Sequence, residues 1–590
     1  MAVSAYAEPM VETYARPRFG EPREPKNRVN PGGRLALVVD FVAGSHARAV
    51  AFLLLCCMLF YLPGFFTIPP IDRDEARFAQ ATKQMVESGD FVDIRFQDDV
   101  RYKKPVGIYW MQAAAVETAA ALGLPRPQAR IWIYRIPSLI GATGAVLLTY
   151  WSALAFVTRR GAIMAALIMC SSVLLSVEAR LAKTDAMLLL TVIAAMGAMA
   201  RVYLSWQRGE DPVRPPWSAP AVFWTALAGG ILLKGPLILM FVGLTVLMLG
   251  ILDRNVGWLW RMRPIWGLMW TLVLVLPWFA AIFLRAGQTF FTDSVGGDML
   301  AKFVGQESHG APPGVYLLLF WVTFWPGAVL AGLAAPAVWR ARREPGAQYL
   351  LAWLIPSWIV FELVLTKLPH YVLPLYPAIA ILAVGGMERR VLSRAAWVIR
   401  GTAWWFVVPA GGSVLAIVGA ITLTRHPVFL AWPFVAAALI FGLIAWWLYD
   451  DGHAERSLLN AVVAALFLSF ATYGAVAPAL TRLFPSPEIA RALRNVKCVG
   501  PKIAAAGFHE PSLVFLTDTS TLLTDGSRAA DFLGQGSCRF ALVESRSERY
   551  FVARAEAIGL RYNVMTRIEG FNFSQGKAIS IAIFRSEGTE

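Results

Sequence analysis

The sequence predicts a polytopic α-helical membrane protein with a small α/β domain at its C-terminal end. Of its 590 residues, 57% are hydrophobic and only 16% are charged, whereas soluble chains contain about 25% charged residues. The mean hydropathy is +0.54. The chain has 22 Trp and 35 Phe, side chains that suit a surface facing lipid and its interface. This composition excludes a string of soluble domains.

Long apolar runs predict the individual spans, because about 17 to 25 mainly apolar residues cross a bilayer as a helix. We predict about thirteen spans, and only Lys234, Gly235 and Pro236 separate the fifth from the sixth. If these two formed one span, everything after them would be inverted. The predicted spans are residues 49–66, 136–157, 162–177, 186–204, 221–233, 237–252, 266–284, 315–339, 350–365, 371–386, 403–424, 430–449 and 459–480.

Basic residues in the short loops predict the orientation, because cytoplasmic loops carry an excess of Lys and Arg. Arginine pairs and triplets occur in every second loop, for example Arg159 and Arg160, then Arg340, Arg342 and Arg343. This alternation puts the N-terminus inside and places the first loop and the C-terminal segment on the external side. It also accounts for much of the net charge of +15, so a nucleic-acid partner is not expected.

The chain divides into three predicted segments. Residues 1–47 form a cytoplasmic tail, rich in Pro, Arg and Glu, that we expect to be disordered. Residues 48–480 form the membrane domain, in which a long first loop spans residues 67–135. Residues 481–590 have the composition of a soluble α/β domain, with strand-like runs at 512–517, 540–545 and 579–584 and helix-like runs at 489–494 and 550–558. The segment boundaries and runs are read directly from the sequence.

The five cysteines fall into two groups. Cys56, Cys57 and Cys170 lie inside predicted spans, where a thiol behaves as a small apolar side chain. Cys498 and Cys538 both lie in the predicted external domain, where an oxidising compartment permits a disulfide. That bond would stabilise the domain by roughly 4 kcal/mol; two free buried thiols are the alternative.

Most charged residues outside the cytoplasmic loops and the C-terminal segment collect at one predicted membrane face. Transport pathways place ionisable groups near the bilayer midplane, whereas these groups lie at span ends. The distribution therefore favours chemistry at the outer interface. The residues concerned are Asp72, Asp74, Glu75, Arg77, Lys103, Lys104, Arg180, Lys183, Asp185, Lys234, Asp293, Asp298, Lys302, Glu307, His309, Lys367 and His370.

Each of these motifs also has a plainer interpretation. The first loop predicts a helix over residues 71–91 and an interfacial helix after residue 105, so Asp72 and Glu75 could simply start a helix. Lysines before a proline could bind anionic lipid heads without specificity. Asp185 could be an N-cap, His309 could be a solvated loop residue, and the lysine and tyrosine of segment 366–374 could snorkel at a span end.

Taken in order, six segments resemble C-type glycosyltransferases of the superfamily of lipid A aminoarabinose transferases and protein O-mannosyltransferases. These segments are DRDEARFAQATKQMVESGDF, RYKKPVGIYWMQ, RLAKTDAMLLL, LLKGP, ESHG and TKLPHYVLPLYPA. The resemblance implies an enzyme of the bacterial inner membrane that takes a sugar from a polyprenyl-phosphate donor at the periplasmic face. The first loop and the C-terminal domain would then be periplasmic.

The resemblance also implies roles for single residues. Asp74 matches the favoured catalytic carboxylate, and Asp185 matches a second acid near the cavity. Lys104 matches the lysine before proline that contacts the donor phosphate, while Lys367 and Tyr371 match the later motif lining the lipid-phosphate site. We further expect four substrate-binding residues: Glu75, Arg77, Lys103 and His309.

One departure bears on metal binding. Aminoarabinose transferases commonly read Glu-Lys-Pro where this chain reads Lys103, Lys104 and Pro105. That glutamate is implicated in metal coordination in the family, so a divalent metal is doubtful here and no cofactor is predicted. The additional positive charge favours a more anionic donor or acceptor.

The predicted function is transfer of a sugar, with inversion, from a polyprenyl-phosphate donor to lipid A or another lipopolysaccharide-type acceptor. Attack on the anomeric carbon would displace polyprenyl phosphate, with Asp74 as general base or orienting group. The alternatives are a protein O-glycosyltransferase and a non-catalytic carrier of a lipid-linked sugar. A carrier predicts inverted repeats with midplane charges, and the sequence shows no clear sign of either.

Overall fold

A computed structural model describes residues 34–210, 216–287, 290, 311–449, 453–496, 498, 500–572 and 574–586. Each predicted apolar run lies in a helix or in consecutive helices. Eight of the helices described are long and apolar enough to cross a membrane, and four shorter apolar helices accompany them. The chain is a mostly helical, multi-pass membrane protein; the count of thirteen spans stays a prediction.

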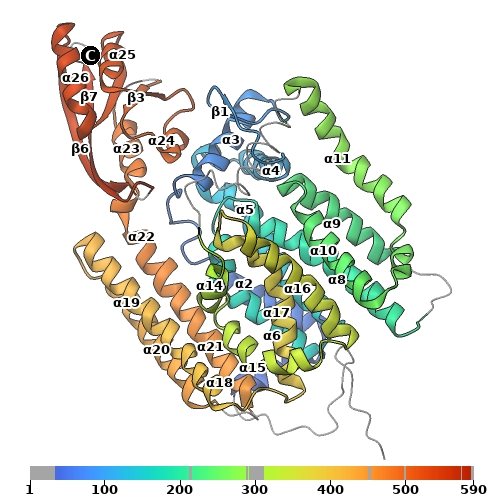
Figure 1. Ribbon diagram of the computed structural model, residues 1–590. Coiled ribbons are helices and arrows are strands. Elements are labelled where there is room, and N and C mark those ends of the chain that lie inside the picture. The colour runs from blue at the N-terminus through green and yellow to red at the C-terminus, as the bar shows by residue number, and fades with distance from the viewer. Residues whose placement is uncertain are drawn as a thin grey trace, which may run out of the picture.

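The N-terminal half contributes a bundle of tightly packed helices (Figure 1). Helix α5 packs on α8, and α8 on α9; Gly141 permits the first contact, because a Cβ there would lie 2.7 Å from the Met187 nitrogen. Helices α9 and α10 are separate, as predicted, and meet at Gly235. The helices are α2 (His46–Tyr61), α5 (Ile131–Ala153), α6 (Arg159–Ser171), α7 (Val173–Glu178), α8 (Asp185–Gln207), α9 (Ser218–Lys234), α10 (Leu237–Asp253) and α11 (Pro264–Ala286).

The second half of the membrane region adds two further groups of helices. In the first, α15 packs on α17 and α16 on α10. In the second, α19, α20 and α21 stand side by side below the C-terminal region (Figure 1). The elements are α14 (Val315–Thr323), α15 (Gly327–Arg340), α16 (Pro345–Leu363), η4 (Pro369–Leu375), α17 (Tyr376–Glu388), α19 (Trp404–Thr424), α20 (Trp432–Trp447), α21 (Ala454–Ser469), η8 (Phe470–Val476) and α22 (Ala477–Ala479).

The expected disordered tail contains a helix in its described part. Helix α1 (Arg34–Ala43) buries Val39 and Val42 and packs against α2, α6 and α21. This segment forms a helix, in contrast to the expected disorder, because its apolar side chains can pack against these neighbouring helices. Residues 1–33 lie outside the described residues.

The first loop forms the two helices that the sequence predicts. These are α3 (Asp74–Ser88) and α4 (Gly107–Ala121), joined through the short strands β1 (Arg95–Phe96) and β2 (Asp99–Val100). Helix α4 begins against the end of α9, where a Cβ on Gly107 would lie 2.7 Å from the Leu232 oxygen. The two helices therefore cover the ends of the helices below them (Figure 1).

Residues 485–586, here called the C-terminal region, form a five-stranded sheet of order β4-β3-β5-β7-β6. Strands β4, β3 and β5 are parallel, whereas β5-β7 and β7-β6 are antiparallel. Apolar clusters cover both faces of the sheet. The elements are α23 (Pro485–Arg494), β3 (Lys502–Ala506), α24 (Pro511–Leu516), β4 (Leu522–Thr524), α25 (Gly526–Gly534), β5 (Arg539–Glu544), α26 (Ser545–Ala557), β6 (Tyr562–Asn572) and β7 (Lys577–Ser586).

One predicted strand of this region is wrong. Residues 512–517 lie mainly in helix α24, which Pro511 opens at its first position. Period alone does not separate a short buried strand from a short buried helix, and a proline suits the first turn of a helix. The predicted strands at 540–545 and 579–584 and the helices at 489–494 and 550–558 coincide with β5, β7, α23 and α26.

Cys498 and Cys538 form a disulfide in the structure, and their Cα atoms are 5.9 Å apart. Cys56, Cys57 and Cys170 are free. Denatured protein purified without reductant should therefore react with a thiol label at three sites, and at all five cysteines after reduction. Mass spectrometry of the labelled chain checks this, and five labelled thiols before reduction would contradict the pairing.

Candidate functional site

The start of α3 is held by a buried ion pair between Glu75 and Arg135. The Arg135 Nε lies 2.7 Å from Glu75 Oε1, and Nη2 donates to Oε2 at 2.9 Å. Arg135 is 0% exposed and Glu75 is 1% exposed. The same carboxylate accepts hydrogen bonds from the backbone N–H groups of Ile71 and Ala182, each at 2.9 Å. Glu75 therefore joins the first loop, α5 and the segment before α8.

Arg135 uses its remaining donors on the chain that leads into the first loop. Its Nη1 donates to the carbonyls of Phe65 and Ile68, and its Nη2 donates to that of Pro69. With both oxygens of Glu75 engaged, this residue positions the loop, which differs from the substrate contact expected for it. Its neighbour Asp74 opens α3 and is exposed.

Four charged groups meet where α7 ends, α8 begins and α9 ends. Lys183 Nζ lies 3.1 Å from Glu178 Oε1 and 3.6 Å from Asp185 Oδ2. Lys234, the last residue of α9, donates a short hydrogen bond to Asp185 Oδ1. All four side chains are at most 10% exposed. Each buried carboxylate is thus matched by an ammonium group, as burial of charge requires.

The turn η4 brings an imidazole and a phenol to the same cluster. His370 Nδ1 lies 3.7 Å from Glu178 Oε1, and its Nε2 lies 3.7 Å from Asp185 Oδ1. The Lys234 ammonium lies 5.3 Å from the ring centre of Tyr371. Tyr371 therefore lies beside these charged groups, and its expected role in lining a lipid-phosphate site stays a prediction.

Two first-loop residues also interact with these groups electrostatically. Asp74 interacts electrostatically with Lys183, and Lys104 interacts with His370. Three carboxylates therefore lie together with three lysines, and their formal charges balance. We call these seven residues the charged cluster: Asp74, Lys104, Glu178, Lys183, Asp185, Lys234 and His370.

Two expected substrate contacts lie at the edge of the charged cluster. Lys103 is exposed, whereas Arg77 is half-buried on α3. Burial and the nearby Arg101 guanidinium lower the pKa of Arg77, while Asp74 opposes that effect. Arg77 and Arg101 thus place positive charge close to Asp74. His309 lies outside the described residues.

Lys367 contacts backbone carbonyls in the structure, and the phosphate contact that the resemblance implies for it stays a prediction. Its Nζ donates to the carbonyls of Phe361, Glu362 and Val364 at 2.7 to 3.2 Å. These three contacts use all three N–H groups of an ammonium, and they satisfy carbonyls at the end of α16. Lys367 therefore fixes the turn into η4, and Lys234 is the lysine that reaches Asp185.

Sequence reasoning did not select Glu178, Lys234 or His370 as site residues. Lys234 and His370 belong to the charged residues predicted at one membrane face but were given no role of their own, and Glu178 was not among those residues. These residues could have been found because placing an ionisable group at the edge of the hydrocarbon costs free energy. Each such residue in the sequence is therefore a functional candidate by default.

Glu178, Asp185 and His370 are also the described residues that could hold a metal, since their ligand atoms lie within 4.8 Å of one another. Two carboxylates and an imidazole would suit several divalent ions. Here, however, Lys183 and Lys234 already contact these carboxylates. The ammonium groups occupy the places of a cation, so this donor set does not fit a resident metal.

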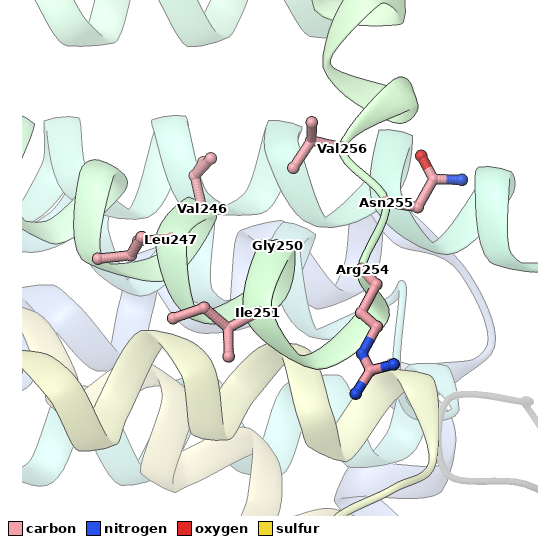
Figure 2. A pocket seen from close by; sticks show the side chains of 7 residues that line it. All are labelled: Val246, Leu247, Gly250, Ile251, Arg254, Asn255 and Val256. Carbon is pink, nitrogen blue, oxygen red and sulfur yellow. The ribbon is translucent and has the colours of Figure 1, made fainter.

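A separate groove of about 410 Å³ lies at the end of α10 (Figure 2). Leu247 and Ile251 are exposed there, as suits a surface in contact with lipid. Its lining contains neither an acid nor a general base. The groove is lined by Val246, Leu247, Gly250, Ile251, Arg254, Asn255 and Val256.

Comparison with known proteins gives a consistent result. Residues 73–288 match the family described as dolichyl-phosphate-mannose-protein mannosyltransferase. An undecaprenyl phosphate-alpha-4-amino-4-deoxy-L-arabinose arabinosyl transferase from Aeromonas salmonicida is 27% identical over 55% of this chain and 57% of its own length. The corresponding enzyme from Edwardsiella ictaluri is 26% identical over 66% and 68% of the two chains. This chain thus matches little more than half of the first relative.

The fold has a counterpart among solved structures. The crystal structure of ArnT from Cupriavidus metallidurans, bound to undecaprenyl phosphate, superposes with a TM-score of 0.71. It covers 91% of this chain and 98% of its own, at 19% identity, so the likeness concerns the fold. Together with the motifs around Asp74 and Asp185, these comparisons show that the chain is similar to membrane glycosyltransferases of the superfamily that includes the aminoarabinose transferases and the protein O-mannosyltransferases.

Proposed function

We propose that this protein transfers a sugar from a polyprenyl-phosphate donor to lipid A or another lipopolysaccharide-type acceptor. The observation that carries the proposal is the charged cluster, in which the exposed Asp74 carboxylate interacts electrostatically with the Lys183 ammonium. A carboxylate can activate or orient an acceptor, and neighbouring lysines can hold a phosphate leaving group. The names of the relatives, which are arabinosyl transferases using undecaprenyl phosphate, support the donor class.

Asp74 is the proposed catalytic carboxylate. It is the exposed acid of the cluster, whereas Glu178 and Asp185 are buried and contact lysines. Asp74 would accept the proton of an acceptor hydroxyl, or orient an acceptor phosphate that is already a nucleophile. The acceptor oxygen would form the new bond to the anomeric carbon as the bond to the polyprenyl phosphate breaks, with inversion.

Lys104 and Lys234 are the proposed partners of the leaving phosphate. Charge accumulates on that phosphate in the transition state, and fixed ammonium groups stabilise it there. Asp185 would orient Lys234 through their hydrogen bond and serve as the second functional acid. Tyr371, Arg77 and the expected contacts Lys103 and His309 would line the same substrate path.

The topology that fits this reaction has thirteen spans, a cytoplasmic N-terminus and a periplasmic C-terminal domain in a bacterial inner membrane. The first loop and the C-terminal region lie at the same end of the helices (Figure 1). A site at the periplasmic surface suits lipid substrates, because both donor and acceptor can reach it from the bilayer.

Purified protein incubated with defined polyprenyl-phosphate sugars and envelope lipids tests the proposal. Mass spectrometry should find the sugar on a glycolipid. Transfer to the protein fraction would favour a protein O-glycosyltransferase, which is the alternative enzyme. Movement of intact donor across vesicles without any product would favour a carrier.

The neighbours Asp74 and Glu75 should respond differently to loss of charge. Asp74→Asn should lower the transfer rate by about 10²- to 10⁴-fold, the usual contribution of a general base, with little change in unfolding temperature. Glu75→Gln should destabilise the fold by about 3–5 kcal/mol, because it leaves Arg135 buried without its anion. Transfer rates and thermal unfolding of both variants check this; near wild-type turnover of Asp74→Asn would remove Asp74 from catalysis.

Lys234 and Lys367 form a second matched pair. Lys234→Met should reduce the transfer rate by about 10²- to 10³-fold, as expected for a lost anion-stabilising donor. Lys367→Met should mainly lower the unfolding temperature, since its ammonium donates to three backbone carbonyls and lies 3.9 Å from the Glu362 carboxylate. Kinetics of the two purified variants distinguish the roles, and the opposite ranking of their rates would return the phosphate contact to Lys367.

Transfer should not require a divalent metal. The ammonium groups of Lys183 and Lys234 already neutralise Glu178 and Asp185, so dialysis against EDTA should leave the rate within about twofold. Rates before and after chelation measure this. Loss of activity that added Mg²⁺, Mn²⁺ or Zn²⁺ restores would show that the donor set does bind a metal.

A further inference from the structure

The C-terminal region contacts the helix that carries Asp74. Residues 510–521, here called the docking segment, include α24 and the turn that follows it, and they lie against α3 (Figure 1). Phe515 is 0% exposed and belongs to an apolar cluster with Ala79 of α3. Its ring centre lies 5.2 Å from that of Tyr134. The docking segment is therefore packed into the first loop.

Polar contacts continue along one side of α3. Lys83 Nζ donates to the Phe515 carbonyl at 3.1 Å, and Gln80 Nε2 donates to Thr519 Oγ1 at 2.8 Å. Gln97 Nε2 donates to the carbonyls of Thr519 and Thr521 at 2.9 and 2.7 Å. Lys83 and Gln80 are buried, so these hydrogen bonds are shielded from water and costly to lose.

The last contact reaches the chain immediately before Asp74. Asp72 Oδ1 accepts a hydrogen bond of 2.9 Å from the Ser512 backbone N–H. Between Asp72 and Asp74 stands Arg73, whose φ of 72° is unusual for a residue other than glycine. Arg73 is also the N-cap of α3 and gives the helix no side-chain capping hydrogen bond. The conformation of this turn therefore depends on contacts such as the Asp72–Ser512 hydrogen bond, because the Arg73 side chain does not cap the helix.

Asp74 thus stands between two anchored acids that point to different parts of the molecule. Asp72 is bound to the C-terminal region, whereas Glu75 is bound to Arg135 of α5. A movement of the C-terminal region would displace Asp72 but not Glu75, because only Asp72 is bound to that region. Burial, partly offset by the bond from Ser512 and the Arg73 charge and reinforced by Glu510, raises the pKa of Asp72 to about 6. Keeping Asp72 ionised in the folded protein therefore lowers the free energy of unfolding.

We propose that the docking segment is a positioning element for the transfer reaction, and that its bond to Asp72 sets the direction in which Asp74 points. Asp72 is then a positioning residue, not a catalytic one. The inference rests on the proposed function, since it assigns Asp74 the catalytic role. A displacement of about 1 Å at a reacting group can reduce a rate about 10²-fold, so a distant docking contact can control turnover.

Two substitutions at Asp72 test this, because they differ in whether an acceptor oxygen remains. Asp72→Ala removes the acceptor for the Ser512 N–H, and we expect kcat to fall about 10- to 100-fold with an unchanged KM for the donor. Asp72→Asn keeps an oxygen at the same place and should retain kcat within about threefold. A Gln80→Ala variant, which weakens docking about two turns away, should give a smaller loss than Asp72→Ala.

Amide hydrogen exchange of the peptide covering residues 71–78 supplies a readout that does not depend on activity. Asp72→Ala should speed exchange there, and Asp72→Asn should not. Wild-type kcat in Asp72→Ala would overturn the inference. So would loss of activity in both variants with unchanged exchange, because Asp72 would then act through its charge. Faster exchange in Asp72→Ala, with no transfer by the wild-type protein, would leave the contact standing and reject the proposed function.

Discussion

The buried pair of Arg135 and Glu75 is the interaction on which the rest of the site depends. Arg135 binds three carbonyls at the start of the first loop, those of Phe65, Ile68 and Pro69, and both oxygens of Glu75. Glu75 in turn accepts from the N–H of Ala182, in the segment that leads into Asp185. One guanidinium therefore fixes the distance between the helix that presents Asp74 and the turn that presents Asp185. A buried ion pair contributes little net stability, so its value here lies in geometry.

The charged cluster shows how a membrane protein keeps ionisable groups at the edge of hydrocarbon. Asp185 contacts Lys234 and Lys183, and Glu178 contacts Lys183. Every buried carboxylate is matched by an ammonium, so the cluster exists without a ligand. A donor phosphate would add negative charge to this balanced set, and the exposed Lys103 together with Arg77 and Arg101 would offset it. The additional lysine at position 103 is consistent with an anionic substrate.

Hydropathy predicted the mostly helical, multi-pass membrane architecture, because apolar composition responds directly to the bilayer; the orientation inferred from loop charge stays a prediction. The sequence also pointed to Asp185, since an acid close to an apolar run is costly, while the family resemblance pointed to Asp74; the roles of both stay predictions. It could not show that Lys367 caps a helix while Lys234 reaches Asp185, because both are lysines at span ends with a proline nearby. That choice depends on which helix ends meet in space, and α9 meets η4 only after folding.

The docking of the C-terminal region was also invisible in the sequence. Residues 512–517 read as a strand, and nothing in their pattern indicated that Phe515 packs on Ala79. Such contacts join positions more than 400 residues apart, so local periodicity carries no information about them. Asp72 illustrates the consequence: its position suggests a helix cap, whereas its carboxylate binds Ser512.

The central claim is that the charged cluster receives the phosphate of a lipid-linked sugar. The most direct measurement is an experimental structure of the protein with bound polyprenyl phosphate. We expect phosphate oxygens within hydrogen-bond distance of the Lys104 and Lys234 ammonium groups. A phosphate bound beside Lys367, or in the groove near Arg254, with both of those lysines unengaged, would contradict it.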